Sequence, residues 1–177
     1  MTSSGTFPGP GPYAAKGLVY AAPIAARPSD HAPAITSRGR ISTVLLATDL
    51  TAASDDATQQ ALDLADSLDA RLLVVNVIDP AARNKSGAGV ARVDQMRAER
   101  EPRLLEVVER ARAWGVESTY LLWTGEPGKS IVAAAEAERA DLIVVGTRGL
   151  ARAGRWLLGS VSDHVVHHAG CPVLVVR

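Results

Sequence analysis

Five short, continuous apolar runs alternate with segments of helical periodicity along the chain, and this alternation limits the possible folds more than any other feature. The runs, rich in Val, Leu and Ile, occupy residues 42–49, 71–79, 118–123, 141–146 and 171–176. Such runs are typical of strands that are buried on both faces of a parallel sheet. Helical segments are predicted between the runs, at 52–68, about 91–114, 127–139 and 160–169.

Strict alternation of strands and helices predicts an α/β protein, a single-domain three-layer sandwich with a five-stranded parallel sheet. Right-handed crossovers put the ligand crevice of such a fold at the carboxyl ends of the strands, near the switch in strand order. Functional residues are therefore expected just after residues 48, 78, 123 and 146.

The charge of the chain argues against a nucleic-acid partner. Residues beyond 40 carry 15 basic and 18 acidic side chains, whereas duplex binding needs a concentrated Lys/Arg surface. A small anionic ligand is compatible with this balance. The single cysteine, Cys171, excludes an internal disulfide and suits a reducing compartment, so a cytoplasmic location is expected.

Residues 1–40 differ from the rest of the chain, because they hold six of its ten prolines and are rich in Gly, Ala and Ser. This composition predicts a flexible extension without packed elements, ahead of one folded domain at 41–177. No apolar run in the extension is long enough to span a membrane, and no secretory signal is recognisable, so no membrane association is expected. A targeting peptide is the alternative interpretation of the extension.

The stretch GEPGKS at residues 125–130 is similar to the end of a nucleotide-binding P-loop. A P-loop needs a glycine five positions before Gly128, and Trp123 occupies that position. Pro127 suits the first position of a helix, and an apolar run follows it. The stretch is therefore predicted to begin a helix.

A glycine-rich loop follows the fourth predicted strand, where the crevice is expected. Gly146, Gly149 and Gly159 would let the backbone turn tightly and approach a ligand. Ser160 is predicted to cap the last helix, whose unpaired N–H groups and positive dipole end, with the nearby Ser162 hydroxyl, would bind an anion. The loop adds three positive charges: Arg148, Arg152 and Arg155.

The pattern G-x2-G-x9-G-S formed by these residues resembles the signature of the ATP-binding branch of the universal stress protein family. The resemblance covers residues 41–177 and includes VLLATDLTAASDDA, LLVVNVID and GCPVLVV. It implies a flavodoxin-like or adenine nucleotide hydrolase-like fold that binds ATP, with Mg²⁺, at the strand ends and forms a homodimer through its last strand.

The resemblance also implies roles for individual residues. Ala47, Thr48 and Val77 would meet the adenine and ribose, while Asp49 would bind the ribose or the metal. Asp49 as an N-cap is the alternative, and Ala47 replaces a proline common in the family. The residues expected around the ribose and phosphates are Gly146, Thr147, Arg148, Gly149, Leu150, Ala151, Arg152, Gly159, Ser160, Val161 and Ser162.

Two further patterns are weaker. DHVVHH at 163–168 has pairs at i, i+4 that suit a metal on a helix, but the family helix is not a metal site and a solvated face explains it. GAGVAR at 87–92 lacks the third glycine of a dinucleotide motif, and residues 80–90 are predicted to form a mobile loop.

The sequence favours a nucleotide-binding module for stress response or signalling over an enzyme. It lacks the motifs of ATP pyrophosphatases and adenylyl transferases, and no general base is evident beside the phosphate loop. No catalytic residue is therefore assigned. Two alternatives stay open: slow ATP hydrolysis, and a sensor of cAMP or another adenine nucleotide.

Overall fold

The computed structural model describes residues 18–21, 40–80, 89–147 and 159–177. The helices are η2 (Ala52–Ser54), α1 (Asp55–Ser67), α2 (Gly89–Ala113), α3 (Pro127–Ala137) and α4 (Ser160–His168). The strands are β1 (Leu18–Ala21), β2 (Thr43–Ala47), β3 (Arg71–Ile78), β4 (Ser118–Thr124), β5 (Leu142–Gly146) and β6 (Val173–Val176). The last five strands and the four α-helices agree with the predicted elements to within a few residues at each end.

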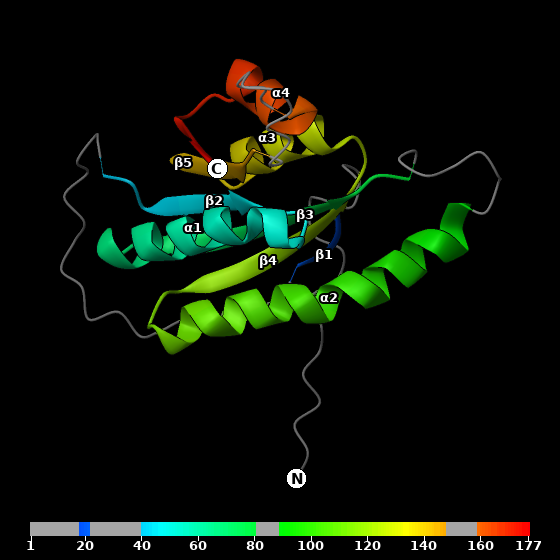
Figure 1. The fold of residues 1–177 in the computed structure, drawn as a ribbon, viewed down its shortest axis with the longest axis horizontal. Coiled ribbons are helices and arrows are strands. Elements are labelled where there is room, and N and C mark those ends of the chain that lie inside the picture. Colours follow the sequence, from blue (N-terminus) through cyan, green and yellow to red (C-terminus); the bar gives the residue numbers. More distant parts are fainter. Residues whose placement is uncertain (1–17, 22–39, 81–88, 148–158) are drawn as a thin grey trace, which may run out of the picture.

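The strands form one sheet in the order β1-β4-β3-β2-β5-β6. Strands β2 to β6 are parallel to one another, which confirms the predicted α/β fold with a five-stranded parallel sheet. From the central β2 the chain proceeds outward through β3 to β4, and it then returns to build β5 and β6 on the other side of β2 (Figure 1). The strand order therefore switches at β2, where a crevice is expected beyond the carboxyl ends of the strands.

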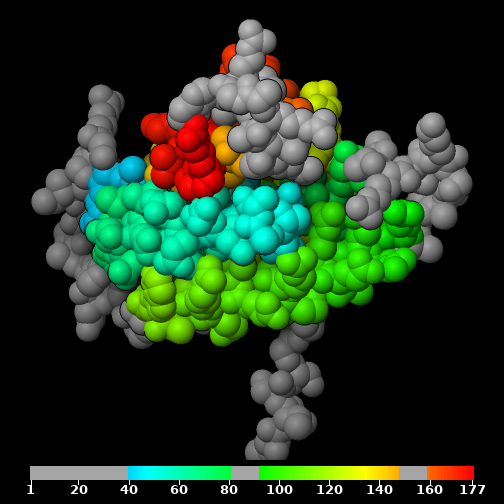
Figure 2. Space-filling view, in the orientation of Figure 1, coloured from blue at the N-terminus to red at the C-terminus, as the bar shows by residue number. Residues whose placement is uncertain are grey.

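Two helices cover each face of the sheet. α1 and α2 share one buried cluster with alternate strand residues such as Leu46 and Val74, and Figure 2 shows both helices on this face. α3 and α4 pack on the intervening strand residues, such as Leu45 and Val75. Strands covered on both faces need apolar side chains at successive positions, and each fully buried Leu or Val contributes about 1.5–3 kcal/mol. No helix in the described part of the chain is both long and apolar enough to cross a membrane.

Strand β1 is the element that the sequence did not predict. It pairs antiparallel with β4, with Leu18 opposite Trp123 and Ala21 opposite Leu121. The prediction that residues 1–40 contain no packed element is therefore wrong for Leu18–Ala21, because the edge of β4 offers hydrogen-bond partners that a short isolated strand lacks. The division into an extension at 1–40 and a domain at 41–177 stays a prediction.

Polar side chains fasten the amino ends of the central strands together. Asp141 Oδ2 accepts hydrogen bonds from Ser42 N, Ser42 Oγ and Thr43 N at 2.9, 2.8 and 3.0 Å. Arg71 donates through Nε to Thr43 Oγ1 at 3.1 Å and forms an ion pair with Glu138 at 3.3 Å. These contacts stabilise the end of the sheet that lies opposite the predicted crevice.

Candidate functional site

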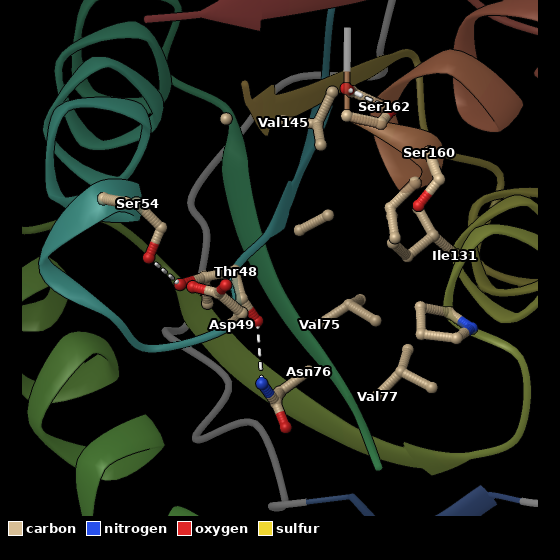
Figure 3. A pocket seen from close by; sticks show the side chains of 16 residues that line it. Thr48, Asp49, Ser54, Val75, Asn76, Val77, Ile131, Val145, Ser160 and Ser162 are labelled. Carbon is tan, nitrogen blue, oxygen red and sulfur yellow. Dashed lines mark hydrogen bonds between the residues drawn. The ribbon is translucent and has the colours of Figure 1, made fainter. Parts of the chain in front are cut away.

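A pocket opens at the carboxyl ends of β2, β3 and β5, where the strand order switches (Figure 3). Helices α3 and α4 form its other wall, and the pocket encloses about 90 Å³ with a mostly apolar described lining. Nine predicted site residues line it: Ala47, Thr48, Asp49, Val77, Gly146, Gly159, Ser160, Val161 and Ser162. The structure therefore brings together four separate segments of the sequence: 47–49, 77, 146 and 159–162.

Of the remaining predicted residues, Thr147 is the one that the structure describes, and it is not part of the described lining. Thr147 follows β5, and its N–H donates to the carbonyl of Val176 at 2.7 Å, which extends the pairing of β5 with β6. Five predicted residues lie outside the described part of the chain: Arg148, Gly149, Leu150, Ala151 and Arg152. Their roles stay predictions. The mobile loop predicted at 80–90 also stays a prediction for 81–88, which are likewise outside, but it is wrong for Gly89 and Val90, which belong to α2.

Sequence reasoning missed several lining residues, most importantly the wall that α3 provides. Pro127 and Ile131 begin that helix and line the pocket opposite β2 and β3, as Figure 3 shows for Ile131. They are one helical turn apart and so share a face of the helix. This spacing is visible in the sequence and could have indicated that α3 lines the pocket. The other lining residues without a predicted role are Ala53, Ser54, Val75, Asn76 and Val145.

Hydroxyl and carboxylate groups hold the loop after β2 in shape. Thr48 Oγ1 and Ser54 Oγ lie 2.9 Å apart, and Thr48 Oγ1 also accepts the N–H of Leu50 at 3.0 Å. Asp49 Oδ1 accepts the N–H and the hydroxyl of Thr51 at 3.0 and 2.7 Å. The alternative that Asp49 caps the following helix is wrong, because Thr51 is the N-cap of η2 and Asp49 orders its own turn.

Asn76 joins the ends of β2 and β3. Its side-chain amide is almost completely buried, with 1% of the residue exposed, and Nδ2 donates to the carbonyl oxygen of Thr48 at 2.7 Å (Figure 3). A buried amide is costly unless its donors and acceptors are satisfied. This bond therefore fixes the distance between the two strand ends that line the pocket.

Helix α4 begins at the pocket. Gly159 is the N-cap, with extended backbone angles of φ −64° and ψ 152°, and Ser160 is the first helical residue. The prediction that Ser160 caps the helix is therefore wrong by one residue, because Gly159 has the non-helical conformation that a cap requires. Ser162 is 1% exposed and donates its hydroxyl to the Gly159 carbonyl at 2.9 Å. The first N–H groups of α4 have no intrahelical partners, so an anion is favoured there.

Gly146 ends β5 at the pocket without being required by the packing of the protein. A Cβ atom at this position would lie 3.6 Å from the Ala53 carbonyl oxygen and from Ala57 Cβ, which is ordinary contact. Gly146 is also not one of the glycines with positive φ in the described chain. A need for glycine here would therefore come from a ligand rather than from the fold.

The GEPGKS stretch begins α3, as predicted, and Pro127 is at the start of that helix. The Lys129 ammonium group forms an ion pair with Glu126 at 2.7 Å, and both side chains are exposed. The hydrogen bond from Lys129 holds the pKa of Glu126 below its ordinary value. Lys129 is not among the residues that line the pocket.

The three histidines of α4 make contacts within the helix itself. His167 Nδ1 lies 2.8 Å from the Asp163 carbonyl oxygen, and the rings of His164 and His168 stack with their centres 4.0 Å apart. Among the described residues, no group of three or more His, Cys, Asp or Glu side chains is arranged to hold a metal ion. Asp49 is the one ionisable side chain in the described pocket lining.

Comparison with known proteins identifies the family of the chain. The sequence profile of the Universal stress protein family matches residues 40–177, which include every element from β2 to β6. The chain belongs to this family. The resemblance inferred from the glycine pattern and the strand sequences is thereby confirmed at the level of the family.

Relatives within the universal stress protein family align over the same region. One from Thermus aquaticus is 39% identical over 141 residues, covering 76% of this chain and 98% of the relative. Another, from Methanocaldococcus jannaschii, is 34% identical over 137 residues and covers 76% and 81%. A universal stress protein solved in complex with cAMP superimposes with a TM-score of 0.61 and 28% identity, covering 78% of this chain and 98% of that one.

Proposed function

We propose that this universal stress protein binds an adenine nucleotide, ATP with Mg²⁺, and acts as a nucleotide-dependent module in stress response or signalling. The observation that carries the proposal is one pocket in which an apolar wall adjoins the start of helix α4. The apolar part suits a flat base, and the helix start suits a phosphate. Phosphates at the start of α4 would extend toward residues 148–158, which separate Thr147 from Gly159 in the sequence.

The base and the sugar would bind at the ends of β2 and β3. Ala47 and Val77 line the pocket from the sheet, and Ile131 lines it from α3, so an adenine ring would lie between apolar surfaces. Asp49, at the rim, would accept hydrogen bonds from ribose hydroxyl groups. The polar backbone at the strand ends would then read the edge of the base.

The phosphates and the metal would bind between β5 and α4. The N–H groups of the first turn of α4 offer directed donors, and Arg148 and Arg152 would supply charge from the connecting loop. Mg²⁺ prefers one or two carboxylates together with phosphate oxygens and water. Asp49, in the loop after β2, is the one carboxylate in the described lining. It is the candidate ligand for the metal as the alternative to its ribose role, so the metal would arrive with the nucleotide and take its other ligands from phosphate and water.

A second candidate ligand is cAMP. The structural neighbour solved with cAMP is 28% identical to this chain, and an adenine pocket accepts either nucleotide. Fast hydrolysis of ATP is not expected, because Asp49 is the one ionisable group in the described lining and its Oδ1 already accepts two hydrogen bonds from Thr51. Slow hydrolysis stays an alternative.

A homodimer through β6 is part of the proposal. β6 lies at the end of the strand order, and all four of its residues are only partly buried. An apolar edge strand is commonly covered by another chain or by a symmetry mate. Light scattering at micromolar concentration should give the mass of a dimer, and a monomer would contradict this part.

Mass spectrometry of nucleotide retained by the purified chain tests the proposed ligand. We expect ATP to be retained, and titration calorimetry should rank ATP and cAMP above GTP, since the proposed base pocket is one for adenine. Release of inorganic phosphate from the bound ATP should be slow or absent. Equal affinity for GTP and ATP, or no binding of either adenine nucleotide, would overturn the proposal.

A further inference from the structure

Two arginines of α2 donate hydrogen bonds to backbone at the strand ends that form the pocket. Arg100 Nη1 donates to the carbonyl oxygen of Val77 and to Asn76 Oδ1, both at 2.8 Å. Arg103 Nη2, one helical turn further, donates to the carbonyl oxygen of Leu50 in the loop after β2. Helix α2 itself contributes no residue to the described pocket lining.

Arg100 also fixes the orientation of the buried Asn76 amide. A guanidinium group can only donate hydrogen bonds, so the amide oxygen must face Arg100. The amide nitrogen then faces the Thr48 carbonyl oxygen, to which it donates at 2.7 Å. Helix α2, the end of β3 and the end of β2 are thus joined in one continuous chain of hydrogen bonds.

Both strand ends in this chain line the pocket, at Thr48 and at Val77. Without the guanidinium group, Asn76 Oδ1 would lose its donor at a site that is 1% exposed, and the amide could turn to other partners. The Thr48 carbonyl would then lose a fixed partner, and the spacing of the two strand ends would no longer be set. A hydrogen bond from a charged donor is stronger than one from a neutral donor. A water molecule in the place of the guanidinium group would therefore not replace the bond to Asn76 Oδ1.

We propose that Arg100 is a positioning residue for the nucleotide pocket: acting through Asn76, it sets the separation of the Thr48 and Val77 segments between which the base binds. The inference rests on the proposed nucleotide function and deepens it. It assigns α2 a role in ligand affinity although none of its described side chains reaches the pocket.

Substitution of Arg100 with a matched control tests this role. We expect Arg100→Ala to weaken ATP binding about tenfold, or roughly 1.4 kcal/mol, in titration calorimetry. Arg112→Ala is the control, because Arg112 is on the same helix and donates to a strand carbonyl, that of Ser118, at 3.1 Å. Ser118 begins β4, at the opposite end of the sheet, so this variant should lose stability without losing ATP affinity.

Two further measurements separate positioning from general destabilisation. Arg100→Lys keeps a cationic donor on a flexible stem and should recover part of the lost affinity. Amide hydrogen exchange without nucleotide should be faster at Leu50 and Thr51 in Arg100→Ala, but not in Arg112→Ala.

Equal ATP affinity in Arg100→Ala and wild type would overturn the inference and leave the proposed function intact. An equal loss in both alanine variants would also overturn it, since that would reflect stability alone. If the wild type binds no adenine nucleotide, the proposed function fails, while unchanged exchange at Leu50 and Thr51 would separately refute the positioning role.

Discussion

The side chain of His164 in α4 packs directly on Gly128 in the first turn of α3. A Cβ atom at Gly128 would lie only 2.8 Å from the Cβ, Cγ and Cδ2 atoms of His164. Real Cβ atoms in proteins essentially never come within 3.0 Å of a neighbouring atom. One of the three near atoms, His164 Cβ, is bonded directly to the backbone of α4 and cannot turn away. Gly128 therefore allows α3 and α4 to approach each other closely, and this packing accounts for the glycine without a role in phosphate binding.

Gly128→Ala should destabilise the protein and weaken nucleotide binding. Alanine is normally better than glycine in a helix by about 0.5–1 kcal/mol, but overpacking costs about 1–3 kcal/mol, so we expect a net loss of about 1 kcal/mol. Because α4 begins at the pocket, its displacement should also lower ATP affinity. Urea unfolding and calorimetry measure the two effects. Adding His164→Ala removes Cγ and Cδ2 but leaves Cβ in place, so it should restore only part of the stability, and a single variant more stable than wild type would contradict the prediction.

Lys129→Ala should leave ATP affinity almost unchanged. The Lys129 side chain is 68% exposed, and it pairs with Glu126 in the first turn of α3. Removing an exposed pair of this kind alters stability by less than about 1 kcal/mol. A tenfold loss of affinity in calorimetry, about 1.4 kcal/mol, would show that this lysine binds phosphate after all.

Gly149→Val and Ser160→Ala should affect the phosphate end of the pocket unequally. A branched side chain at Gly149 would block the close approach of backbone to ligand that the sequence predicts, so ATP binding should be abolished. Ser160→Ala removes one hydroxyl but leaves the N–H groups of α4, so the expected loss is about 1 kcal/mol or less. Calorimetry compares the two, with circular dichroism as the test of intact fold. Wild-type affinity in Gly149→Val would remove the basis of the ATP assignment.

Asp141 should make the fold less stable in acid. Burial raises the pKa of this carboxyl group, but hydrogen bonds from Ser42 and Thr43 and the charge of Arg71 outweigh burial, and the pKa lies below the ordinary 3.8. A pKa that is lower in the folded state gives stability above the unfolded pKa, and this stability is lost as pH falls through the folded pKa.

The free energy of unfolding should therefore decrease below about pH 4, and less steeply in Asp141→Asn. Urea unfolding at a series of pH values provides the comparison. Identical slopes in the two proteins would show that Asp141 does not contribute to the acid dependence.

The parallel sheet was predictable because each strand is covered on both faces. Residues such as Leu45 and Leu46 pack on opposite helix layers, so the sequence shows an uninterrupted apolar run at each strand. The pocket followed from topology, since carboxyl strand ends meet where the order switches. The exact N-cap of α4 was harder to predict from the sequence. Ser160 and Gly159 are both good cap residues, and only the backbone angles decide between them.

Contacts between distant segments were not predictable from periodicity. Arg100 reaches Asn76 across 24 positions of sequence, and nothing in the spacing of either residue indicates the other. β1 has only four residues within a proline-rich region, and its pairing depends on the backbone of β4. Side-chain networks and edge pairing are therefore the parts that required a structure.

The unequal margins of the sheet have a consequence for stoichiometry. β1 occupies the outer side of β4, whereas within the described residues no strand pairs with the outer side of β6. β1 is itself an edge strand of only four residues, but it covers part of the longer, apolar edge of the seven-residue β4. A long apolar edge strand is a template for pairing with another chain, so a chain without residues 1–39 should form larger, concentration-dependent species.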